Sequence, residues 1–118
     1  MTTTEITERL FESINTRELD DVAALLTDDT VFYFPKTAPL EGKRRIITFF
    51  KVLFRKFPSL SFSIGRVIAN ESMAAVEWTN HGTLKDNTPY ANAGVTVIEV
   101  NEGVITYMSD TFKDTGLF

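Results

Sequence analysis

The first apolar pattern along the chain is helical. Ile6, Leu10 and Ile14 recur at four-residue spacing, which is typical of one buried face of a helix. Thr2 and Glu5 stand three residues apart just before this pattern, as in a capping box. The sequence therefore predicts that the first element is an amphipathic helix that begins with a side-chain cap.

The apolar pattern stays mainly helical up to residue 57. The elements predicted next are a short helix at 19–26, a stop at 27–29 (TDD), a strand at 31–34 and a helix at 42–57. Pro35 ends the predicted strand, because proline has no N–H to donate to a sheet. Pro39 and Gly42 mark a loop, and Pro58 ends the long helix.

From residue 59 onward the apolar period changes from about four to two. Leu60, Phe62 and Ile64 alternate with serines, which is typical of a strand with one buried face. Further strands are predicted at 73–83, 90–100 and 104–112, separated by turns at 70–71, 85–89 and 101–103. Short turns between consecutive strands indicate an antiparallel sheet. Helices followed by such a sheet predict an α+β fold of two layers.

Composition narrows the classes of function. A chain of 118 residues favours one domain, spanning 1–118. The net charge is −4, which argues against nucleic-acid partners and anionic membrane surfaces. The basic residues at 43–45, 51, 55 and 56 are interpreted as the solvated face of the long helix. There are no cysteines, and there is neither a signal-like start nor an apolar run long enough to span a membrane. We therefore expect a cytoplasmic protein.

Three segments carry a resemblance to a known family. They are DDVAALLTDD at 20–29, LEGK at 40–43, and PYANAGVTVIEV at 89–100 with Gly103, Ile105 and Asp110 beyond it. Together they resemble SnoaL-like domains of the NTF2-like superfamily, which is related to ketosteroid isomerase, over nearly the whole chain. The resemblance implies a cone in which the N-terminal helices pack on a curved antiparallel sheet and leave a pocket between the layers.

Strand alternation then assigns side chains to the two faces of the sheet. If the resemblance holds, one face lines the cavity with Phe32, Phe34, Val76, Trp78, Asn80, Asn92, Thr96, Met108, Asp110 and Phe112. A mainly apolar lining with a few polar groups is typical of a small-molecule pocket. The opposite face carries Glu77, Thr79, Val95, Val97, Glu99 and Tyr107. In the family this face commonly packs on a second subunit, so we expect a homodimer through it.

Asp110 is the first candidate for chemistry. It is in phase with Met108 and Phe112, and a carboxylate among apolar side chains has a raised pKa. SnoaL-like cyclases use an acidic residue on the last strand as acid/base, so the resemblance implies this role for Asp110. Ketosteroid isomerase activity is not expected, because the positions of its base, its tyrosine and its neutral acid hold Phe34, Leu10 and Thr96. Relatives of limonene-epoxide hydrolase add an arginine and a second aspartate, and no arginine here has the matching parity.

Three interpretations of Asp110 remain open at this point: acid/base catalysis, ligand binding without catalysis, and a structural role. In the first two, Trp78, Asn80 and Asn92 orient a small apolar carbonyl compound or a water. His81, the only histidine, has outward parity, and no set of residues resembles a metal or cofactor site. The function hypotheses are therefore a cofactor-independent enzyme, a ligand-binding protein, and an assembly module that recruits a partner through the sheet.

Overall fold

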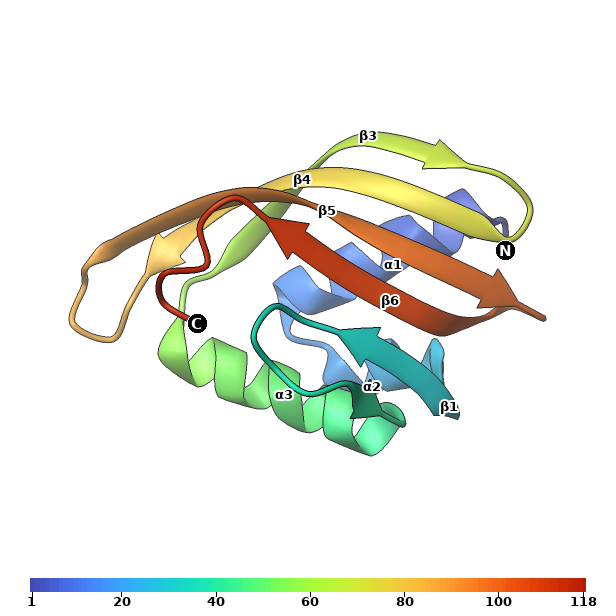
Figure 1. Cartoon of the computed structure of the whole chain (residues 1–118), viewed down its shortest axis with the longest axis horizontal. Helices are drawn as coiled ribbons and strands as arrows, with labels where there is room; N and C mark the ends of the chain where they lie inside the picture. Colours follow the sequence, from blue (N-terminus) through green and yellow to red (C-terminus); the bar gives the residue numbers. More distant parts are fainter.

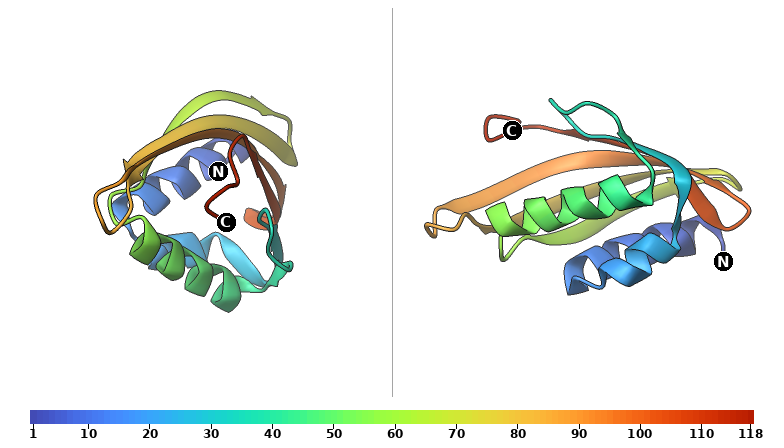
Figure 2. Two further views of the ribbon diagram at one scale, coloured as in Figure 1. Left: turned by 60° about the vertical axis from the view of Figure 1, so that its left-hand side comes forward. Right: turned by 90° about the horizontal axis from the view of Figure 1, so that it is seen from below.

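The computed structural model describes residues 1–118 and contains three helices on one face of a six-stranded sheet (Figure 1). The elements are α1 (Thr3–Thr16), α2 (Leu19–Ala24), β1 (Leu26–Tyr33), β2 (Leu40–Glu41), α3 (Lys43–Lys56), β3 (Ser61–Ala69), β4 (Met73–Thr83), β5 (Pro89–Asn101) and β6 (Val104–Phe112). The strand order is β2-β1-β6-β5-β4-β3. The predicted α+β class is thus confirmed, and the sheet curves over the helices without closing on itself (Figure 2).

The predicted helix starts and buried faces are confirmed. Thr2 caps α1 through its hydroxyl, which accepts from the Glu5 N–H at 3.1 Å, while the Glu5 carboxylate accepts from the Thr2 N–H at 2.9 Å. Ile6, Leu10 and Ile14 are at most 4% exposed and pack against the sheet. Gly42 caps α3 with a φ of 86°, a conformation that favours glycine.

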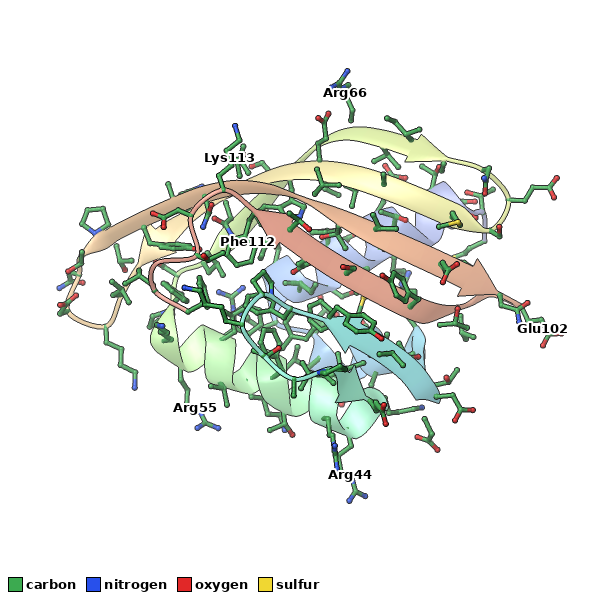
Figure 3. All side chains as sticks on the ribbon, viewed as in Figure 1. Arg44, Arg55, Arg66, Glu102, Phe112 and Lys113 are labelled. Atoms are coloured by element: carbon green, nitrogen blue, oxygen red, sulfur yellow. The ribbon has the colours of Figure 1, made fainter.

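Five of the six basic residues of α3 are exposed on its solvent-facing side, as predicted, whereas Lys43 is half-buried. Arg44, Arg45, Lys51, Arg55 and Lys56 are all exposed. Figure 3 shows Arg44 and Arg55 pointing away from the rest of the molecule. Because these charged side chains stay in solvent, they pay no desolvation cost, and the opposite face of the helix packs into the core.

The region between α2 and α3 differs from its prediction. Leu26 and residues 27–29, expected as the end of a helix and its stop, belong to the first half of β1. Leu26 pairs in parallel with Ile105, and the Thr30 hydroxyl donates to the Ile105 carbonyl at 2.6 Å. Pairing with a strand 75 residues away thus overrides the local helical pattern, as tertiary context often does.

Two further features of the sheet correct the prediction. Leu40 and Glu41, expected in a loop, form the short strand β2, which pairs antiparallel with Phe32 and Val31 of β1. The four strands β3–β6 are antiparallel, as predicted, whereas β1 runs parallel to β6. The complete sheet is therefore mixed. None of the three helices is long and apolar enough to cross a lipid bilayer.

Candidate functional site

Asp110 lies on the inner face of β6, where strand alternation places it. Its neighbours in phase, Met108 and Phe112, are 2% and 9% exposed. Across the sheet it pairs with Thr96 of β5, whose hydroxyl donates to Asp110 Oδ1 at 2.7 Å. The residue is half-buried, and it lies beside the aromatic side chains of the inner face. Burial raises the pKa of Asp110 to about 7, although the hydrogen bond from Thr96 offsets part of that rise.

Trp78 of β4 completes a chain of hydrogen bonds that ends at Asp110. The indole Nε1–H donates to the Thr96 hydroxyl oxygen at 2.8 Å. A hydroxyl has one proton and two lone pairs, so Thr96 accepts from Trp78 and directs its own proton to Asp110 Oδ1. The second carboxyl oxygen, Oδ2, receives no hydrogen bond from the protein and is the oxygen left for a ligand.

Gly94 allows the indole of Trp78 to reach Thr96. It lies between Trp78 and Phe112 in the register of β4, β5 and β6. A Cβ atom at this position would lie 2.8 Å from Trp78 Cζ2 and 2.4 Å from the Thr111 carbonyl oxygen. Any side chain here would push the ring or the β6 backbone away. Glycine is therefore a requirement of the hydrogen-bond chain, although its own φ is not left-handed.

A cavity adjoins Asp110 between the sheet and α3. Its lining residues are Phe34, Phe49, Phe50, Leu53, Leu60, Phe62, Trp78, Asn80, Tyr90, Asp110, Phe112 and Phe118. The free space at its centre is about 20 Å³, which is room for about one water molecule. Asn80 Oδ1 is buried in this lining without a hydrogen-bond partner. An orphaned buried oxygen is rare in folded proteins and indicates a position where a donor from a ligand or water is expected.

The structure brings five of the predicted site residues into this lining: Phe34, Trp78, Asn80, Asp110 and Phe112. Of the ten residues predicted to line the cavity, the other five lie elsewhere, among them Val76, which is fully buried in the core. Thr96 is buried beneath the cavity and acts on Asp110 as described above. Phe32 and Met108 are each 2% exposed and belong to the packed core.

Asn92 has a different set of contacts. Its amide donates to the Asp114 carbonyl at 2.7 Å and to the Tyr90 hydroxyl at 2.9 Å, and its oxygen accepts from the Asp114 N–H at 3.1 Å. Its amide therefore holds the segment that follows β6 and does not line the cavity. His81 is exposed on the outer side, and no group of three or more acidic or histidine side chains is placed to hold a metal ion.

Several lining residues were missed from the sequence. Tyr90 has the same parity as Asn92 and Thr96, so alternation alone places it on the inner face. Phe49 lies one position before the buried Phe50 in α3, at the edge of the helix's buried face. Phe118 carries no such signal, because it lies beyond the last strand where neither period applies.

A second hollow, on the outer face of the sheet, is larger. It is an open groove of about 570 Å³ whose lining includes Ile64, Glu77, Val95, Thr111 and Lys113. Its carboxylate, Glu77, pairs with Arg66, which lowers the pKa of Glu77. For chemistry we therefore consider the smaller inner cavity, where Asp110 and Asn80 lie together.

Comparison with known proteins identifies the family. The SnoaL-like domain family matches residues 7–108. The chain belongs to this family. No significant match is found among curated proteins. The cavity lining of this SnoaL-like domain contains no arginine or lysine.

Solved structures agree with this family in fold. A protein from Jannaschia sp. CCS1, provisionally described as a SnoaL-like polyketide cyclase, is similar at a TM-score of 0.86 and 20% identity over 93% of this chain and 84% of that one. An NTF2-like protein from Anabaena variabilis has a TM-score of 0.83 and 24% identity, over 96% of this chain and 87% of that one. An epoxide hydrolase from Mycobacterium tuberculosis, described as similar to limonene-epoxide hydrolase, has a TM-score of 0.80 and 23% identity, over 92% of this chain and 80% of that one. At these identities the likeness establishes the fold alone.

Proposed function

We propose that this SnoaL-like domain binds a small, mainly apolar carbonyl compound in its inner cavity and transfers a proton through Asp110, without a cofactor. The observation that carries this proposal is a carboxyl group with a pKa of about 7 at the edge of an aromatic-walled cavity. An acid or base with a pKa near the working pH is the most effective proton carrier. Near neutral pH Asp110 is present in both protonation states.

In this proposal the groups around the carbonyl compound have distinct tasks. Asp110 Oδ2 removes the proton from the carbon next to the carbonyl, while Thr96 holds Oδ1 and stabilises the carboxylate of the resting state. The electron pair of the broken C–H bond moves into the enolate. The Tyr90 hydroxyl accepts from Asn92, so its own proton is free to donate to the enolate oxygen. The proton on Asp110 then goes to a different carbon of a conjugated enolate, which gives the isomerised product. In a cyclisation the enolate carbon instead attacks a second carbonyl of the same substrate, and the proton goes to the alkoxide oxygen that forms.

Deuterium exchange tests this proposal without knowledge of the natural substrate. Ketones of graded shape, such as acetophenone, 2-tetralone and cyclohexyl methyl ketone, are incubated in D₂O, and deuterium entry beside the carbonyl is followed by NMR. We expect the protein to accelerate exchange of at least one ketone. Asp110→Asn should lower that acceleration by about 100-fold or more, the usual contribution of a positioned acid/base. Asp29→Asn, an exposed aspartate of β1, is the matched control and should change nothing.

A second candidate function is ligand binding without turnover. It is favoured by the absence of any positively charged side chain from the cavity lining, because a cation would stabilise an enolate most directly. In that case Asp110 is a neutral hydrogen-bond donor for the ligand. Binding of a ketone without accelerated exchange would support this candidate, and full exchange by Asp110→Asn would contradict the catalytic proposal.

We also propose that the outer face of the sheet forms a homodimer interface. Val95, Val97 and Tyr107 are half-buried there beside the open groove described above, a mixed surface that a partner would cover. The same interface argues against an assembly module that recruits a different protein through this face. Sedimentation equilibrium of the intact protein tests the proposal, and a monomer at micromolar concentration would contradict it.

A further inference from the structure

The residues after β6 close the inner cavity. Lys113 extends the pairing of β6, since its N–H donates to the Ala93 carbonyl at 3.0 Å, and the chain then leaves the sheet. Figure 2, left, shows this segment turning inward between the sheet and α3. The ring of Phe118 becomes part of the cavity lining. We call residues 113–118 the strap.

Phe118 sits in a box of aromatic rings. Its ring centroid lies 5.3 Å from those of Phe34 and Phe112 and 6.3 Å from that of Tyr90. Lys56 Nζ lies over the same ring at 4.9 Å. These are ordinary distances for stacked or edge-on aromatic pairs. The cavity therefore already holds one aromatic ring, and this ring belongs to the protein itself.

The strap is held by few polar contacts from three separate elements. Asn92 of β5 bonds the Asp114 backbone in both directions, and Lys36, between β1 and β2, donates to the Thr115 carbonyl at 2.9 Å. Lys56, the last residue of α3, donates to the Leu117 carbonyl. Both lysines are exposed, so water competes for their bonds. Beyond Lys113 no strand pairing holds the segment, and its release breaks only these side-chain bonds and the ring contacts.

The remaining free space is too small for any organic ligand. It is about 20 Å³, whereas a known apolar cavity that binds benzene has about 150 Å³. A ligand that reaches Asp110 must therefore take space that a side chain now fills. Phe34, Leu60 and Phe118 are the lining residues outside the helices and strands, and of these three only Phe118 is half-buried. Its departure costs less than the movement of a ring in β6 or α3.

We propose that the strap is displaced when a ligand binds, and that Phe118 now occupies the position of an aromatic ring of that ligand. This inference rests on the proposed binding of a carbonyl compound in the same cavity, and it names the class as aryl carbonyl compounds. The apparent affinity is then reduced by the fraction of molecules in which the strap is closed. Removing the Phe118 ring removes that cost.

Titrations with acetophenone, followed by amide and indole NMR signals, test the inference. Trp78 is the only tryptophan, so its indole N–H gives one signal that reports the cavity. In the unmodified protein we expect this signal and the Phe118 amide to shift together with one dissociation constant. Phe118→Ala should bind acetophenone about tenfold more tightly or better, because open conformers are typically ~10% populated or less. Cyclohexyl methyl ketone, whose six-membered ring is not aromatic, should bind more weakly to both proteins.

Two controls separate the strap from general loosening. Leu117→Ala changes the neighbouring, 45% exposed side chain of the strap and should leave the affinity unchanged. Lys56→Met keeps the ring and removes one bond to the strap, so it should tighten binding by a smaller factor even if Phe118→Ala folds poorly. Lys51→Met, an exposed lysine of the same helix, is its matched control.

The contradicting results are distinct from those of the catalytic proposal. Equal affinity of Phe118→Ala and the unmodified protein, no binding by either, or binding with an unshifted Phe118 amide would each overturn the strap inference. Asp110→Asn should still show displacement of Phe118. If it does, and yet keeps full deuterium exchange, the strap stands and the catalytic role of Asp110 fails.

Discussion

Two adjacent parts of the same sheet face differ sharply in how they are filled. On β5 and β6, Ile98 faces Met108, while the next inward pair is Thr96 and Asp110. Around Ile98 the core is solid, with Ile6, Ile98 and Ile105 fully buried. Around Asp110 the same face carries a carboxyl group with a raised pKa, an orphaned amide oxygen and a small cavity.

This difference separates what stabilises the fold from what is kept for a ligand. Burial of apolar side chains is the main favourable term in folding, and the Ile98 region supplies it. Buried polar groups that lack partners cost stability, and the Asp110 region contains one such oxygen, Asn80 Oδ1. Strands β5 and β6 continue from one region into the other without interruption, so the solid region positions the polar one. Substitution of Ile98 should therefore lower the free energy of unfolding, whereas removal of the Asp110 charge or of the Asn80 amide should raise it.

The largest expected effect is that of Asp110→Asn on the pH dependence of stability. Because the folded-state pKa of about 7 lies above the ordinary 3.8, the native state binds a proton that the unfolded chain releases between these values. The free energy of unfolding of the unmodified protein should thus fall as pH rises through this window, by on the order of 4 kcal/mol in all. Asparagine keeps an acceptor for Thr96 and carries no charge, so the variant should be more stable near pH 8.

Urea unfolding near pH 4.5 and pH 8.5 measures this effect. The gain of Asp110→Asn should be small at the lower pH and largest at the higher one, and Asp29→Asn should show no such gain. A variant that is less stable than the unmodified protein at pH 8.5 would show that Asp110 is a satisfied structural carboxylate.

In the solid region, Ile98→Ala should cost about 3 kcal/mol, because it leaves a cavity at a fully buried position. Its cross-strand partners, Ala74 and Met108, do not titrate, so the loss should be equal at both pH values. Ile68→Ala, at a 66% exposed position of β3, is the control and should stay within about 0.5 kcal/mol. A pH-dependent loss for Ile98→Ala would mean that the two regions are coupled.

Thr96→Val should act on both stability and titration. Valine has a similar shape but leaves the Trp78 N–H without an acceptor, which should cost about 2 kcal/mol. It also removes the hydrogen bond that lowers the pKa of Asp110, so that pKa should rise above 7. Carboxyl-carbon NMR titration measures the rise, with Thr79→Val on the outer face as control. An unchanged pKa would show that Thr96 does not donate to Asp110.

The smallest expected effect is a gain in stability, in contrast to the losses expected for Ile98→Ala and Thr96→Val. Asn80→Leu should stabilise the protein by about 1 kcal/mol, because it removes a buried oxygen that has no partner. Asn92→Leu should instead destabilise it, since the amide of Asn92 is bonded to Asp114 and Tyr90. Equal losses for both variants, measured by thermal unfolding, would mean that Asn80 is satisfied in solution and is not held in reserve for a ligand.

The sequence predicts the faces of the sheet better than it predicts the contacts between strands. Alternation places Trp78, Thr96 and Asp110 on one face, because the period of two is a local property of each strand. Their hydrogen-bond chain depends on the register of three strands and on Gly94, which no single segment encodes. The start of β1 was missed for the same reason, since its pairing with Ile105 is formed far along the chain.

Closure of the cavity was also beyond prediction. The strap belongs to no helix or strand after Phe112, so no periodic pattern indicates where Phe118 lies. The free space depends on how aromatic rings from β1, α3, β6 and the strap meet, which is a property of the packed structure. Sequence reasoning thus identified Asp110 and most of the lining residues on the sheet, whereas the structure was needed to show that Phe118 fills the cavity.

The missing side chain at position 94 has a spectroscopic consequence. Because Gly94 has no Cβ beside the indole ring, Trp78 lines both the inner cavity and the outer groove of the sheet. Trp78 is also the only tryptophan of the chain. Its fluorescence should therefore respond to a ligand on one side of the sheet and to a second subunit on the other, so a single emission spectrum monitors both events.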